Sequence, residues 1–205
     1  MKSLSNYCAV AVLALSFSSC GGGQPDATRD AKDSNMTKMD STGIKDSART
    51  QTSGAIPASV SKDDATFVVN TANAGMTEIQ AGQLAQQKGM AKDVKAYGSM
   101  MEKDHTAAAD KLKAVAASKN ITLPSAIAPD MQKNIDDLQK KDGKDFDKAY
   151  ISMMVDDHKK VISMFENEVK NGSDADIKAF ANSTLPTLQH HLAEAQKCQK
   201  MEKKM

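Results

Sequence analysis

The chain has 205 residues, a length that indicates one domain with appendages. Its 27 Lys and Arg residues nearly balance 26 Asp and Glu residues, so charge gives no support for binding to nucleic acid or to anionic lipid. Trp is absent and unbranched side chains are abundant, a composition that favours helix over sheet.

Residues 1–19 have the features of a bacterial lipoprotein signal peptide. Lys2 precedes an apolar run at residues 9–17 that is too short to span a bilayer. Ser18 and Ser19 then lead into Cys20, a segment that looks like a lipobox and so implies cleavage before Cys20 and acylation of its thiol. The alternative is an ordinary secretory signal with an incidental cysteine. We therefore expect a lipid-anchored protein of the cell envelope, held by the outer membrane and facing the periplasm.

Residues 20–60 are expected to form the lipidated cysteine and a disordered tether. Ser, Thr, Asp, Lys and Gly fill most of this stretch. So few apolar side chains cannot bury enough surface to offset the entropy lost when a chain is ordered. Processing would leave Cys198 as the one cysteine of the folded part, which excludes an internal disulfide there.

Residues 61–205 are predicted to be an all-α antiparallel four-helix bundle. Ser61 and Asp64 have the spacing of a helix N-terminal cap. Apolar residues then recur at helical spacing over four segments, with a short extra helix at about 131–140 between the second and the third. The four segments cover residues 61–88, about 91–118, about 145–171, and 173 onward. Gly75 and Gly82 are expected to allow close approach of a neighbouring helix.

An internal echo connects the second and third long helices. Residues 96–105 and 149–158 share seven of ten amino acids. Each segment carries Tyr, Met and His at i, i+4 and i+8, on one helical face. These residues are Tyr97, Met101, His105, Tyr150, Met154 and His158.

One glutamate and three histidines are predicted to meet in the middle of the bundle. His105 and His158 lie near the midpoints of their helices, and Glu78 and His191 lie within about one turn of theirs. The midpoints of antiparallel helices share one layer, whichever way each helix runs. Glu78, His105, His158 and His191 are thus the candidate metal ligands.

Two interpretations of this layer stay open. In the first, it binds one metal ion, and nearby carboxylates, thioethers and phenols add ligands or orient them. In the second, it is a structural polar layer whose members satisfy one another. Zinc, iron or manganese suits His with carboxylate, whereas copper, favoured by nearby Met, is the weaker candidate. The additional candidate residues are Glu102, Asp104, Asp157, Glu194, Met101, Met154, Tyr97 and Tyr150.

Four phrases in the folded part resemble the family known as domain of unknown function 4142. They stand at residues 75–85, 100–105, 146–150 and 185–192. The resemblance implies an exported, ferritin-like bundle associated with the outer membrane, and no settled activity. Ferritin-like di-iron proteins use Glu-x-x-His on two helices. Here Glu102 and His105 match that spacing, but Val155 replaces the second Glu, so one mononuclear site is expected.

The function predicted from these residues is metal binding by a lipid-anchored envelope protein, in envelope stress or metal handling. The competing hypothesis is a non-catalytic module that binds another envelope protein and whose His layer is structural. No nucleophilic elbow or phosphate-binding loop is present, so the sequence gives enzymatic activity little support. No nucleic-acid partner is expected.

Overall fold

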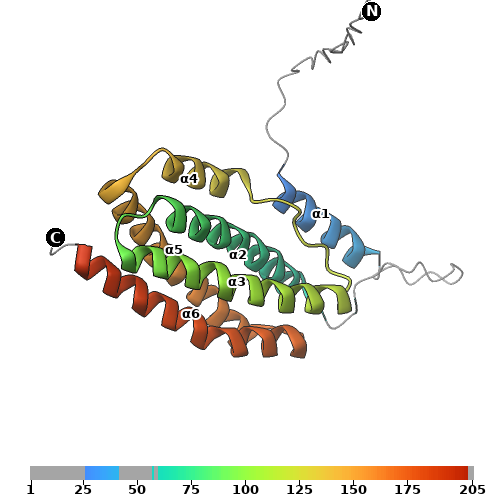
Figure 1. Cartoon of the computed structure of the whole chain (residues 1–205). Helices are drawn as coiled ribbons and strands as arrows, with labels where there is room; N and C mark the ends of the chain where they lie inside the picture. Colours follow the sequence, from blue (N-terminus) through green and yellow to red (C-terminus); the bar gives the residue numbers. More distant parts are fainter. Residues whose placement is uncertain (1–25, 42–56, 58–59, 203–205) are drawn as a thin grey trace, which may run out of the picture.

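The computed structural model describes residues 26–41, 57 and 60–202. Within these residues the protein is all-helical, with six helices and no strand (Figure 1). The predicted α class is therefore confirmed. The helices are α1 (Ala27–Asp40), α2 (Lys62–Lys88), α3 (Lys92–Ser118), α4 (Pro129–Gln139), α5 (Gly143–Asn171) and α6 (Ala175–Glu202). The predicted signal peptide, its lipidation site Cys20 and much of the predicted tether lie outside the described residues.

Four long helices carry the core. α2 packs against α3 and α5, and α6 packs against α5 and α3, while the short α4 lies against α2 and α5 (Figure 1). Their ends fall within two residues of the predicted limits. No helix in the described part combines the length and the apolar character needed to cross a membrane.

Two buried aspartates connect the helix pairs α2–α3 and α5–α6. Asp64 completes the predicted capping box with Ser61 at the start of α2. Its carboxylate also accepts the backbone N–H groups of Ser173 and Asp174 in the α5–α6 loop, at 2.9 and 3.1 Å. Asp147, near the start of α5, likewise accepts the N–H groups of residues 90 and 91 in the α2–α3 loop, at 2.9 and 2.7 Å. Each loop is thus held by the other helix pair.

Close backbone contact between α2 and α3 depends on two glycines. A Cβ atom added to Gly82 would lie 2.7 Å from the carbonyl oxygen of Gly98, and one added to Gly98 would lie 2.7 Å from that of Gly82. The expected close approach is therefore confirmed at Gly82. At Gly75 it is wrong, because an added Cβ meets nothing within 4 Å there. Gly75 borders open space.

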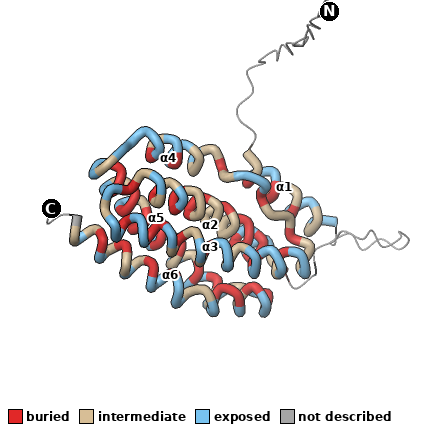
Figure 2. The backbone as a smooth tube through the Cα atoms, in the orientation of Figure 1, coloured by how far each residue is buried: buried red, intermediate tan, exposed pale blue. Residues whose placement is uncertain are grey.

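Buried residues recur along the long helices (Figure 2), and their apolar side chains form two hydrophobic clusters. One surrounds Phe67, Phe165 and Ile177, towards the end where α2 begins. The other surrounds Met101 and Tyr150, towards the opposite end. Glu78 and the three buried histidines each lie, along their own helix, between residues of one cluster and residues of the other. A polar layer therefore stands between two apolar ones.

Residues 26–41 depart from the expected disordered tether: they form α1, which packs against α2. Asn35 explains the difference, because its amide donates to the carbonyl of Thr122 at 3.0 Å and accepts the N–H of Thr122 at 2.7 Å. Lys38 adds a bond to the carbonyl of Asn120 at 2.9 Å. For this segment the prediction of disorder is wrong, since it counted apolar burial and left out polar side chains that bind the backbone of a distant loop.

Candidate metal centre

Glu78, His105, His158 and His191 come together between the two apolar clusters, one from each long helix. Each has a relative exposure of 6 % or less. The centroids of the three imidazole rings lie 5.2 to 5.7 Å apart. One nitrogen of each ring lies within 4.8 Å of the corresponding nitrogens of the other two, a spacing that could hold a metal ion.

Glu78 lies on the outer side of two of these rings. Its Oε2 is 3.2 Å from Nδ1 of His105, and its Oε1 is 3.4 Å from Nδ1 of His158. The same Nδ1 of His158 lies 2.9 Å from the backbone carbonyl oxygen of Met154. A backbone carbonyl only accepts, so Nδ1 of His158 carries the hydrogen, and Nδ1 of His105 carries it whenever Glu78 is ionised.

The third ring is oriented by a different carboxylate. Nε2 of His191 lies 3.1 Å from Oδ2 of Asp104, so this nitrogen carries the hydrogen and donates it. Behind the ring, the hydroxyl of Tyr97 donates to the backbone carbonyl of His191 at 3.3 Å. Asp104 and Tyr97 both come from α3, so this helix fixes the ring of α6.

Three ring nitrogens remain, each with a lone pair and no hydrogen. Nε2 of His158 and Nδ1 of His191 lie 3.4 Å apart, and both are left without a hydrogen to share. Nε2 of His105 is buried and has no hydrogen-bond partner in the described part of the chain. The two lone pairs that face each other in the His158–His191 pair repel, whereas a cation beside them would bind both and could also take a nitrogen of His105.

Burial controls the charge of this layer. It lowers the pKa of His105 to about 4, against a small opposing effect of Asp104, and it lowers the pKa of His191 to about 4 despite the bond to Asp104. The pKa of His158 is lowered too, mainly by burial, with the Glu78 carboxylate opposing the shift. At neutral pH the imidazoles are therefore uncharged, the form that binds metals. Burial raises the pKa of Glu78 to about 7, against the effect of His158.

The Tyr and Met residues of the internal echo pack behind the histidines. Met101 and Met154 are fully buried, and Tyr97 and Tyr150 meet edge to face at 6.0 Å between centroids. The Tyr150 hydroxyl is buried without a hydrogen-bond partner in the described residues. This layer fills the core on one side of the centre, and the echo in the sequence reflects its two facing halves.

Three predicted carboxylates have partners elsewhere. Glu102 accepts from the side-chain amides of Gln83 and Gln86 at 2.8 and 2.6 Å, on the outside of the α2–α3 pair. Asp157 and Glu194 each pair with a lysine three residues further along the same helix. Asp157 acts on the centre through its charge alone, by raising the pKa of Glu78.

One contact at the centre could not be predicted from the sequence. The Met154 carbonyl that accepts from His158 is a backbone group of the preceding turn. Every residue has such a carbonyl, so the amino-acid type at this position does not predict the contact. The prediction of Glu78 as a ligand also changes in detail. Its carboxylate faces the two Nδ1 atoms that carry hydrogen, so it lies next to the rings and outside the space between the free lone pairs.

Comparison with known proteins gives one match. The model of the family described as Domain of unknown function (DUF4142) matches residues 49–198, which include all four residues of the centre, α2 to α5 and most of α6. No curated protein and no solved structure matches the chain.

Proposed function

The chain belongs to the DUF4142 family, and from its centre we propose that it binds one transition-metal ion through His105, His158 and His191. The observation that supports this proposal is which nitrogen of each imidazole ring faces an oxygen acceptor. Each ring has one nitrogen facing an oxygen acceptor, and the remaining nitrogens are left to a cation. A histidine that binds a metal ordinarily donates its other N–H to a carboxylate or a carbonyl in this way.

The spacing of the donors supports the same conclusion. A tetrahedral ion with metal–nitrogen bonds of about 2.0–2.1 Å holds neighbouring donors about 3.3 Å apart. Nε2 of His158 and Nδ1 of His191 lie 3.4 Å apart without any adjustment. A ring nitrogen of His105 completes a set of three donor atoms that all lie within 4.8 Å of one another, so small side-chain shifts would bring the third donor to bonding distance.

Three neutral imidazoles suit several ions. Zinc, iron and manganese accept imidazole, and copper does so as well. The sulfur-bearing Met101 and Met154 pack behind the rings, so they contribute bulk to the core. Three protein ligands leave at least one further coordination position, as at zinc sites that bind an exogenous molecule. Metal handling in the cell envelope, or protection of the envelope under stress, is the role that we propose.

A titration of the full chain tests the binding. We expect one Zn²⁺, Co²⁺, Fe²⁺, Mn²⁺ or Cu⁺ ion per chain, and loss of binding in His158→Gln. His190→Gln is the matched control, because His190 is the exposed neighbour of His191 and lies outside the cluster of three buried rings. Binding of none of the five ions by the wild type would refute the proposal. Equal binding by wild type and His158→Gln would place the metal elsewhere.

The overall arrangement that we propose is a ferritin-like, antiparallel four-helix bundle. It is supported by the two short loops, residues 89–91 and 172–174, which reverse the chain within each helix pair. The packing of α2 with α5 and of α3 with α6 joins the two helix pairs around one core. A crystal structure with a different helix order around the core would contradict it.

The location that we propose is the cell envelope, with Cys20 lipidated and the helices facing the periplasm. The lipobox-like segment ending in Ser18, Ser19 and Cys20 supports this. In a bacterial host, the wild type should incorporate labelled palmitate and fractionate with the outer membrane. Cys20→Ala should do neither, whereas Cys198→Ala should behave as the wild type. Unlabelled wild-type protein would exclude the anchor.

A further inference from the structure

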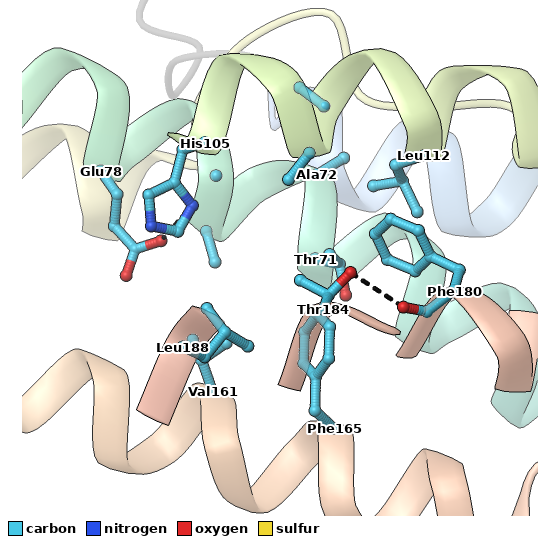
Figure 3. A pocket seen from close by; sticks show the side chains of 14 residues that line it. Thr71, Ala72, Glu78, His105, Leu112, Val161, Phe165, Phe180, Thr184 and Leu188 are labelled. Carbon is cyan, nitrogen blue, oxygen red and sulfur yellow. Dashed lines mark hydrogen bonds and ion pairs between the residues drawn. The ribbon is translucent and has the colours of Figure 1, made fainter. Parts of the chain in front are cut away.

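A small cavity borders the metal centre on the side opposite the Tyr and Met layer. Its volume is about 30 Å³, enough for a molecule of about two heavy atoms. Glu78 and His105 lie at one end of it, and Leu112 and Phe180 at the other (Figure 3). We call this cavity the chamber.

The position of the chamber follows from helix geometry. One helical turn from each of the four residues of the centre stands a residue that lines the chamber. These residues are Gly75, Ala108, Val161 and Leu188. Two of them have no side chain or only a methyl group, and a Cβ added to Gly75 would meet nothing within 4 Å. The core layer next to the histidines is therefore incompletely filled.

The opposite side of the centre is closed. Met101 and Met154 stand one turn away in that direction and are fully buried in tight apolar surroundings. The chamber is therefore the side on which a metal held by three imidazoles has space for a further ligand. His105, whose Nε2 lacks a partner in the described residues, itself lines the chamber.

The walls select for uncharged molecules. Leu112, Val161, Phe165, Phe180 and Leu188 supply most of the lining, and a charged group would lose its hydration among them, away from the polar end at Glu78 and His105. The hydroxyl of Thr184 donates to the carbonyl of Phe180 at 2.8 Å (Figure 3), whereas the buried hydroxyl of Thr71, in the same lining, has no hydrogen-bond partner in the described residues.

The path from solvent to the chamber is short. Six lining residues from α2, α3 and α6 have small side chains and are partly exposed, so little separates the chamber from water. They are Ala72, Ala74, Gly75, Ala108, Ala109 and Thr184.

From these observations we infer that the chamber admits a small uncharged molecule, of the size of a diatomic gas, to the open coordination position of the metal. This inference rests on the proposed metal site. It adds the class of ligand that the bound ion would take and the route by which the ligand arrives.

Xenon tests the chamber without any metal. Under xenon pressure, the methyl resonances of Leu112, Val161 and Leu188 in the full chain should shift. They should not shift in Gly75→Leu or Ala108→Leu, which fill the chamber from facing helices. Ala96→Leu adds a similar bulk on the exposed face of α3 and should respond as the wild type. Unshifted resonances in the wild type would overturn the inference.

Nitric oxide tests the connection to the metal. The Co²⁺-loaded chain should bind nitric oxide, seen as loss of the cobalt EPR signal, and both chamber-filling variants should bind it at least tenfold more weakly while they retain one Co²⁺ per chain. Unchanged affinity in these variants, or equally tight binding of azide, would overturn the inference, because the open position would then face solvent. If xenon enters but no metal binds, the proposed function fails, and with it the role of the chamber, although the cavity itself stands.

Discussion

Nε2 of His158 and Nδ1 of His191 face each other across 3.4 Å, while the other nitrogen of each ring faces an oxygen acceptor. Neither ring can turn to relieve this contact without leaving its acceptor. The folded protein therefore holds a pair of opposed lone pairs in a buried place, which a cation would stabilise.

A bound metal should raise the stability of the fold. Because the unfolded chain does not present the three rings together, an ion at one hundred times its dissociation constant should add about 2.7 kcal/mol to the free energy of unfolding. Thermal unfolding with and without Zn²⁺ or Co²⁺ measures this effect. His190→Gln should gain as much as the wild type. An equal gain in His158→Gln would show that the stabilising ion binds outside the centre.

Asp104 should control affinity through His191. Asp104→Ala removes the acceptor at 3.1 Å that fixes the ring, and we expect affinity for metal to fall about 10- to 100-fold. Glu102→Ala, two residues earlier on α3, removes a carboxylate that binds Gln83 and Gln86 instead, and should leave the affinity unchanged. Competition with a chromogenic chelator measures both. A similar loss in the two variants would point to a general effect of negative charge.

Glu168 should make the protein less stable as pH rises. Burial, assisted by the neighbouring Asp64 carboxylate, raises the pKa of Glu168 from 4.5 to about 7. The folded state thus binds more protons than the unfolded state between these values, and this contribution to stability, complete below pH 4.5, is lost as pH rises through about 7. Glu168→Gln should remove this pH-dependent contribution. Between pH 4.5 and pH 8, the free energy of unfolding of the variant should therefore rise relative to that of the wild type by on the order of 1–3 kcal/mol.

Urea unfolding at a series of pH values measures this slope. Glu166→Gln makes the same change on an exposed neighbour and serves as the control. A Glu168→Gln variant that keeps the wild-type slope would assign the pH dependence to other groups, such as Glu78.

Two glycines of α2 should respond to alanine in opposite directions. Gly75→Ala should stabilise the protein by about 0.4–1 kcal/mol, because the new methyl group enters open space and the unfolded chain loses freedom. Gly82→Ala should destabilise it by about 1–3 kcal/mol, since its Cβ would lie 2.7 Å from the carbonyl oxygen of Gly98. Chemical denaturation measures the free energy of unfolding of the two variants. Destabilisation by both would mean that the space beside Gly75 is filled.

Asn35 should hold α1 in place. Asn35→Ala removes two hydrogen bonds to the backbone of Thr122, so the amides of residues 27–40 should exchange faster with solvent and protease should cut there sooner. The long helices should keep their protection. Asn134→Ala, on the exposed face of α4, is the matched control. Undisturbed protection of α1 would show that its contacts with α2 are sufficient.

Helical periodicity was enough to predict the four long helices, because Gly89 and Gly172 interrupt the pattern sharply and Ser61 with Asp64 marks a start. The meeting of Glu78 with the three histidines followed from their places near helix midpoints. Which nitrogen faces which oxygen did not follow, since ring orientation depends on contacts such as the Met154 carbonyl. The helical state of α1 was missed because Asn35 binds a loop 87 residues away.

The exchange of loop contacts between Asp64 and Asp147 has a consequence for how the molecule assembles. Neither helix pair supplies the carboxylate that binds its own loop. The α2–α3 loop donates hydrogen bonds to a side chain of α5, and the α5–α6 loop donates them to a side chain of α2. The two halves should therefore acquire order jointly, as a single cooperative unit. The histidine pocket, assembled from both, then exists only in molecules that have completed folding.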